Sequence, residues 1–152
     1  MQLREVKAAD VPQVVALVRE TLAEFGLEFG KGAVTDDQLF HLPGSYTEGG
    51  GAFFVVEEGG ALLGTAGVAP VASGVFELRK MYLTKASRGR GVGTQLLAAC
   101  VAHARARGAR HLVLDTIEKM TAAITFYEKH GFVRDDAQVR GARCSRGYRL
   151  DL

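Results

Sequence analysis

Strand-like runs of apolar residues, three of them consecutive, dominate the middle of the chain. They read "AFFVVEE", "ALLGTAGVAPV" and "VFELRKMYL". Gly59 with Gly60 separates the first two runs, and Ser73 with Gly74 separates the last two, as in hairpin turns. The pattern therefore predicts an antiparallel meander of three strands.

Shorter runs predict further strands at residues 2–6, in "RHLVLDT" and in the alternation of Tyr148, Leu150 and Leu152. Helical spacing of apolar residues predicts one helix after Asp10 and Pro12, another from Val92 to Gly108, and a third over "MTAAITFYEKH". The order is a mixture of β and α elements without an internal repeat.

The connection over residues 26–50 is long and rich in glycine. Thr35 followed by Gln38 has the form of a capping box, which predicts a short helix over "TDDQLFHL". Long connections often cover binding sites, so we expect this one to wall a pocket through Phe29, Phe40, His41 and Tyr46.

Length and composition favour one globular domain over residues 1–152. Of 152 residues, 47% are apolar and 24% charged, and 19 basic against 17 acidic residues argue against a dedicated nucleic-acid binder. No apolar run has the length of a signal peptide core or a membrane span, so we expect a cytoplasmic protein that does not bind membranes. Cys100 and Cys144 lack paired spacing and the histidines lack ligand spacing, so we expect reduced thiols and no metal.

The segment "RGRGVG" lies between a predicted strand and a predicted helix. Such a loop directs several backbone N–H groups toward one point at the positive end of a helix dipole, where an anion such as phosphate can bind. The segment lacks Gly-Lys-Ser/Thr, and its glycine spacing departs from the dinucleotide fingerprint. A plain glycine-rich turn is the alternative.

Arg88, Gly91 and Gly93 match the acyl-CoA signature of the GNAT superfamily of N-acyltransferases. The flanking segments "ELRKMYL" and "AAITFYEKHGF" resemble the family's fourth strand and its motif after the fifth strand. The resemblance runs from Gln2 to about Phe132 and implies an α/β (α+β) GNAT fold. In that fold a mixed, mostly antiparallel sheet of about seven strands, flanked by about four helices, splays between strands four and five.

The resemblance also implies acetyl-CoA as co-substrate. Its pyrophosphate is expected on the loop residues Arg88, Gly89, Arg90, Gly91, Val92, Gly93 and Thr94. Its pantetheine arm is expected to pair with the backbone of Met81, Tyr82 and Leu83.

Two residues match the family's catalytic positions. Glu77 is expected to accept a proton from the amine, directly or through water, and Tyr127 to protonate the leaving thiolate. Each has a structural alternative: Glu77 as a salt-bridge partner of Arg79, and Tyr127 as a core residue of an amphipathic helix.

Arg79 is a candidate for binding the acceptor. Simple alternation places Glu77, Arg79, Met81 and Leu83 on one face, where the guanidinium could hold a substrate carboxylate. The alternatives are an Arg79 that pairs with Glu77 or faces solvent, and a bulge that exchanges it for Lys80.

These features predict an N-acetyltransferase, monomeric or homodimeric, that acts on a small-molecule amine such as an amino acid. The alternatives are a protein or peptide acetyltransferase and a non-catalytic acyl-CoA sensor. A fourth possibility is a nucleic-acid patch formed by Arg134, Arg140, Arg143, Arg146 and Arg149, which a solvated surface explains better.

Overall fold

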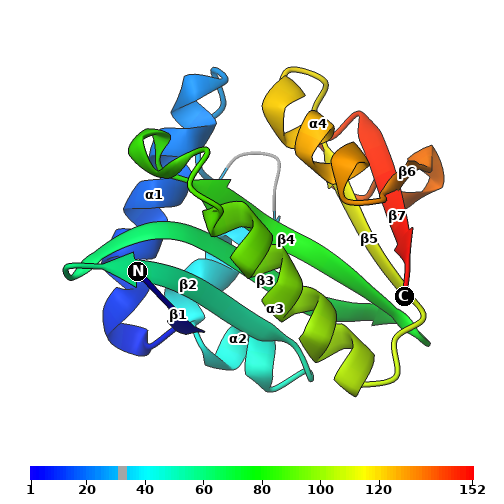
Figure 1. Ribbon diagram of the computed structural model, residues 1–152, viewed down its shortest axis with the longest axis horizontal. Coiled ribbons are helices and arrows are strands. Elements are labelled where there is room, and N and C mark those ends of the chain that lie inside the picture. Colours follow the sequence, from blue (N-terminus) through cyan, green and yellow to red (C-terminus); the bar gives the residue numbers. More distant parts are fainter. Residues whose placement is uncertain (31–33) are drawn as a thin grey trace.

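The computed structural model describes residues 1–30 and 34–152. Seven strands form one sheet in the order β1-β2-β3-β4-β5-β7-β6 (Figure 1). The strands are β1 (Gln2–Glu5), β2 (Ala52–Glu58), β3 (Ala61–Ala72), β4 (Val75–Leu83), β5 (His111–Thr116), β6 (Val133–Arg134) and β7 (Arg146–Asp151). The α-helices are α1 (Val11–Glu24), α2 (Gly44–Thr47), α3 (Val92–Ala106) and α4 (Thr121–Lys129). Short 3₁₀ helices are η1 (Ala8–Asp10), η2 (Val34–His41), η3 (Lys85–Ser87) and η4 (Asp136–Gln138).

The predicted meander and the mixed sheet are confirmed. Strands β2, β3 and β4 pair antiparallel in succession, whereas β4 and β5 pair parallel. This parallel pairing covers only Val75 to Glu77 on β4, so within the part of the chain that the structure describes the rest of β4 has no strand partner on the β5 side. The sheet therefore opens between β4 and β5, and β5, β7 and α4 lie beyond the opening (Figure 1).

Each face of the sheet carries its own hydrophobic cluster. On one face, Leu96 and Cys100 of α3 and Ile124 of α4 pack with Phe76 and Leu78 of β4. On the other face, the apolar side of α1 packs with residues of η2 and α2. The helical periodicities predicted for α1, α3 and α4 are thus explained by burial against the sheet. No helix of the described residues is long and apolar enough to cross a membrane.

Strand β4 contains a β-bulge that overturns the simple alternation expected for it. Opposite Thr65 and Gly67 of β3 stand Tyr82 and Arg79, so β4 carries one extra residue between them. Lys80 takes the strained conformation, with φ of +53°. The bulge leaves Arg79 and Lys80 on the face of Glu77 and moves Met81 and Leu83 to the α3 face, where they pack against the other cluster.

The short helix predicted around Asp36 is present as a 3₁₀ helix, η2. The carboxylate of Asp36 is fully buried and accepts a hydrogen bond from the amide of Gly30 at 2.7 Å. The ammonium of Lys80 pairs with it, and Arg143 donates to it at 3.2 Å. These long-range contacts bind η2 to the bulge of β4 and to the segment that carries Arg143.

The pKa of Asp36 reflects two opposing effects. Burial is the largest single effect and raises it, but the hydrogen bonds from Lys80, the Gly30 amide and Arg143, together with the charge of Lys80, outweigh burial and lower the pKa below its usual range. Asp36 therefore stabilises the fold as an ionised group that joins η2, the bulge of β4 and the segment that carries Arg143.

We expect Asp36→Asn to lower the free energy of unfolding at pH 7 by about 3–5 kcal/mol, because the buried ammonium of Lys80 loses its counter-ion and Arg143 loses a carboxylate partner. Urea unfolding measures this loss. The difference from wild type should shrink as pH falls from the unfolded carboxyl pKa, about 3.9, through the lowered folded pKa, since the wild-type carboxylate is then protonated as well.

Glu58→Gln is the matched control, because Glu58 pairs with Arg90 on the surface and both side chains are more than 40% exposed. Its unfolding curve should stay close to that of the wild type. Equal destabilisation by the two substitutions would contradict the role assigned to Asp36.

Candidate active site

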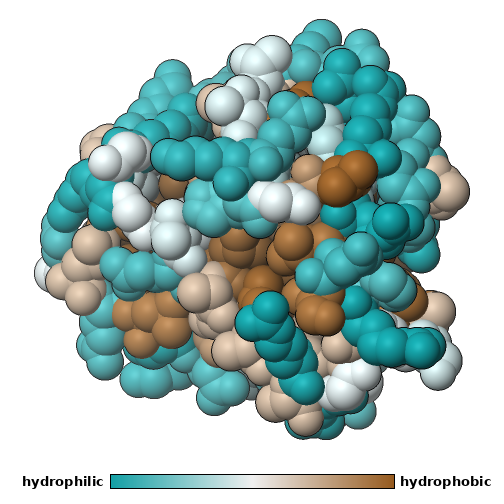
Figure 2. Space-filling view, turned by 45° about the vertical axis from the view of Figure 1, so that its right-hand side comes forward, coloured by the Kyte–Doolittle hydropathy of each residue, from teal (hydrophilic) through white to brown (hydrophobic). Residues whose placement is uncertain are grey.

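A cavity of about 940 Å³ lies at the opening of the sheet. Its walls come from α1, η2, the end of β4, the loop before α3, β5, α4 and residues 140–144. Apolar side chains gather in the middle of one face of the molecule within a polar rim (Figure 2). The lining includes these predicted residues: Glu77, Arg79, Met81, Tyr82, Leu83, Arg88, Gly89, Gly93 and Tyr127. Arg90, Gly91, Val92 and Thr94 do not line it.

The glycine loop enters α3 through two residues with positive φ. Gly89 has φ of +79° and Gly91 has φ of +81°, conformations that glycine adopts without steric cost. Within the described residues, no hydrogen bond is donated by the amides of Gly89, Gly91, Val92, Gly93 or Thr94; the first amide of the helix that donates is Gln95, to Gly91 at 3.1 Å. Free donors at a helix N-terminus are suited to bind an anion.

The two arginines of the loop are paired with acidic residues. Arg88 binds both carboxylate oxygens of Glu24 at 2.9 and 3.0 Å, and these bonds lower the pKa of Glu24. Arg90 likewise binds both oxygens of Glu58. An anion on the loop would therefore compete with these carboxylates for the arginines.

The unpaired edge of β4 offers backbone groups to the cavity. The amide of Thr84 donates to Leu63 of β3 at 2.9 Å, so by strand alternation the amides of Leu83 and Met81 point away from β3. The amide of Tyr82 points toward β3. Of the three residues predicted to pair with pantetheine, Met81 and Leu83 thus have the suitable backbone orientation.

Tyr127 lies on α4 and is 7% exposed. Its ring packs edge-on against Phe126 and Phe132, with centroids 5.8 and 5.6 Å away. Burial raises its pKa, so the phenol keeps its proton at neutral pH. Among the described residues, none forms a hydrogen bond with its hydroxyl. The side chain is both a core residue and a protonated group at the cavity.

Glu77 is buried and is held by two guanidinium groups. Arg79 Nε donates to Glu77 Oε1 at 2.6 Å, and Arg140 Nη1 lies 3.5 Å from Glu77 Oε2. The alternative of a Glu77–Arg79 salt bridge is therefore present in this structure. Arg140 is a partner that the sequence did not indicate.

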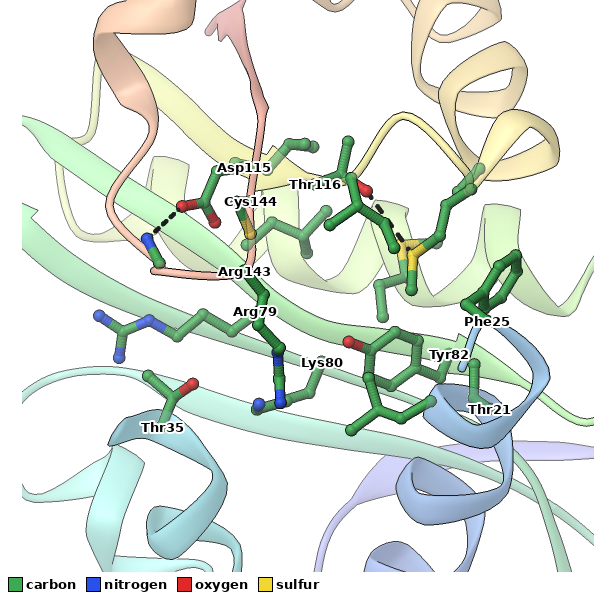
Figure 3. Close-up of a pocket in the computed structure, with 18 of the residues that line it drawn as sticks. Thr21, Phe25, Thr35, Arg79, Lys80, Tyr82, Asp115, Thr116, Arg143 and Cys144 are labelled. Atoms are coloured by element: carbon green, nitrogen blue, oxygen red, sulfur yellow. Dashed lines mark hydrogen bonds between the residues drawn. The ribbon is translucent and has the colours of Figure 1, made fainter. Parts of the chain in front are cut away.

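Residues 140–145, here called the strap, bring this partner into place. Asp115 at the end of β5 accepts hydrogen bonds from the amides of Arg140 and Gly141 at 2.6 and 2.7 Å, and the amide of Ser145 donates to Thr116. Arg143 then reaches from the strap toward Lys80, beside Tyr82 (Figure 3). The strap thus spans the side of the cavity where Glu77 and Lys80 lie.

The arginines considered as a nucleic-acid patch are individually paired with acidic residues. Arg134 pairs with Asp136, Arg146 with Glu118, and Arg149 with Asp135 and Asp151. Arg140 and Arg143 turn into the cavity instead. No local signal marks these two, because their partners Glu77 and Asp36 lie far away in the sequence.

The connection over residues 26–50 lines the cavity, although not through the aromatic residues expected. Leu27, Gly30, Val34, Thr35 and Asp37 contribute to the wall. Tyr46 is buried against Phe53, and Phe40 packs on Phe29 outside the cavity lining.

Comparison with known proteins identifies the family. The model of the acetyltransferase (GNAT) family matches residues 15–132. The uncharacterized N-acetyltransferase YjgM of Escherichia coli is 35% identical over 138 residues, which cover 88% of this chain and 83% of that protein. A GNAT-family acetyltransferase from Staphylococcus aureus superposes with a TM-score of 0.89 at 21% identity, covering 99% of this chain and 98% of that one. The PaiA N-acetyltransferase of Thermoplasma acidophilum, solved with coenzyme A, gives a TM-score of 0.81 at 16% identity, with 99% and 98% covered. The chain belongs to the GNAT family of N-acetyltransferases.

Proposed function

We propose that this protein transfers the acetyl group of acetyl-CoA to the primary amine of a small molecule. The observation that carries the proposal is a single cavity that joins three features. These are Gly89 and Gly93 of the loop with free amides, the unpaired edge of β4, and the two candidate proton-transfer groups, Glu77 and Tyr127.

The chain's own groups fit acetyl-CoA. The amides between Gly89 and Thr94 would hold the pyrophosphate, with Arg88 and Arg90 shared between it and their present carboxylate partners. The amides of Met81 and Leu83 would hydrogen-bond the pantetheine arm as a neighbouring strand would. The neighbour from Thermoplasma acidophilum was solved with coenzyme A, which supports an acyl-CoA co-substrate for this fold.

Glu77 begins the chemistry. An aliphatic amine with a pKa of about 8 to 10 is mostly protonated at neutral pH and must lose a proton before it can attack. Glu77 accepts that proton, directly or through one water. The neutral amine then attacks the thioester carbonyl, and the new negative charge on oxygen is stabilised by the amide of Met81 or Leu83.

Tyr127 completes the transfer. As the carbonyl re-forms, the C–S bond breaks, and the departing thiolate takes the proton of the phenol. The new amide nitrogen loses its surplus proton, which restores Tyr127 through solvent. The products are the N-acetylated acceptor, the thiol of CoA and one proton.

The strap favours a small acceptor over a protein or peptide. We call the side of the cavity that carries Glu77, Arg79 and Lys80 the acceptor side. The contacts of the strap with β5, and the Arg143–Asp36 pair, cross this side, where a peptide groove would have to be open. A pure acyl-CoA sensor would need neither Glu77 nor Tyr127, yet both line the cavity.

We expect Gly91→Ala to raise the Kd for CoA by about tenfold, because a β-carbon at positive φ costs about 1–2 kcal/mol and displaces the donor amides. Titration calorimetry measures the affinity. Gly108→Ala is the control: Gly108 has φ of +78°, its β-carbon also meets open space, and it lies at the other end of α3. If both variants bind CoA equally well, the loop does not hold the cofactor.

We expect Tyr127→Phe to reduce kcat by about 100-fold or more while leaving CoA binding intact, because only the proton donor is removed. Release of CoA thiol across a panel of amines measures turnover. Tyr148→Phe serves as the matched control, since Tyr148 packs beside Tyr127 and its hydroxyl contacts Glu128 and Arg146 instead of the cavity. An unchanged kcat in Tyr127→Phe would exclude the phenol as the acid.

A further inference from the structure

Two cations surround the single carboxylate of Glu77. Arg79 contacts one oxygen and Arg140 the other, and the Glu77 side chain is only 7% exposed. Neither arginine has a second carboxylate partner among the described residues. The cluster of Glu77, Arg79 and Arg140 therefore holds one surplus positive charge at the wall of the cavity.

Both arginines keep donors for another anion. A guanidinium has five N–H donors, and Arg79 uses its Nε toward Glu77. Its two terminal nitrogens are the edge that binds a carboxylate bidentately. Arg140 comes from the strap, where Nη1 also donates to the backbone and side-chain oxygens of Gln138, and its side chain is 41% exposed.

We propose that the acceptor is a short amino acid whose carboxylate binds Arg79 and Arg140, and that this binding loosens their contacts with Glu77. Glu77 then becomes available to accept the proton of the amine only when the acceptor is in place. The proposal rests on the proposed acetyl transfer and adds to it the class of acceptor and the control of the base.

Sharing of Arg79 and Arg140 between two carboxylates explains why binding of the acceptor would release Glu77. A carboxylate oxygen that already accepts a hydrogen bond from a cation has less capacity for a new proton. When a second carboxylate takes part of the same donors, each bond to Glu77 weakens. Because one pair of arginines serves both carboxylates, the amine must lie within a few bonds of the acid to reach Glu77.

An acceptor series tests the proposal in the wild-type protein with acetyl-CoA. The best amino acid of a panel is compared with its amide and with its decarboxylated amine, and CoA thiol release is measured. We expect kcat/KM for the acid to exceed that for either analogue by about 10- to 100-fold, the value of a hydrogen-bonded charge. Part of the difference should lie in kcat, because the analogues leave Glu77 bound to its arginines.

Arg79→Gln separates binding of the carboxylate from general damage. We expect kcat/KM for the acid to fall by about 10- to 100-fold and that for the amide to hold or rise. Arg105→Gln makes the same chemical change on the exposed surface of α3 and should leave kcat/KM unchanged for both the acid and the amide. Equal losses for acid and amide in Arg79→Gln would overturn the proposal.

Free propionate supplied with the decarboxylated amine tests the coupling itself. Propionate should occupy the same arginines and raise kcat in a saturable way, whereas chloride at equal ionic strength should not. The rise should be absent in Arg79→Gln. No rise in the wild-type protein would overturn the release of Glu77.

Failure of the proposed function gives a different result. If amines are acetylated without preference for acids, the carboxylate site is wrong and the acetyl transfer stands. If no amine is acetylated, calorimetry measures binding of the same amino acids to the protein in the presence of CoA. Binding in the wild-type protein that Arg79→Gln abolishes would support the carboxylate site without the acetyl transfer. No binding in the wild-type protein would overturn the carboxylate site.

Discussion

The fold depends on the separation of β4 from β5 after three residue pairs. In an ordinary sheet the backbone groups of Met81 and Leu83 would be paired with a neighbouring strand, and leaving such groups unpaired away from water is unfavourable. Here they border a cavity of about 940 Å³. The site is thus an interruption of the sheet, which carries a separate hydrophobic cluster on each of its two faces.

The bulge at Lys80 adds the second constraint. One extra residue in β4 turns Arg79 and Lys80 to the same face, and each then meets a buried carboxylate, Glu77 or Asp36. The strap supplies a second cation to each carboxylate through Arg140 and Arg143. Because buried charges are costly unless paired, these contacts specify how η2, β4 and the strap lie around the acceptor side.

Sequence reasoning recovered what local patterns encode. Apolar periodicity predicted the meander, α1, α3 and α4, because each pattern reflects burial within one element. It raised the bulge in β4 only as an alternative, did not specify the 3₁₀ form of η2, and missed the inward turn of Arg140 and Arg143. Each of these depends on contacts between segments far apart in the chain, such as Asp36 with Lys80 and Arg143, and no periodicity reports such contacts.

The two ends of the cavity also differ in whether local sequence or distant contacts determine their chemistry. The anion loop consists of backbone amides within a few consecutive residues, so its chemistry is visible in "RGRGVG". The acceptor side consists of charged side chains from η2, β4 and the strap, and its net charge follows from which charged residues the fold brings together there. Specificity for the acceptor is therefore a property of the folded arrangement: changing Arg140 or Arg143 in the strap would alter the charge that an acceptor meets while leaving the loop before α3 as it is.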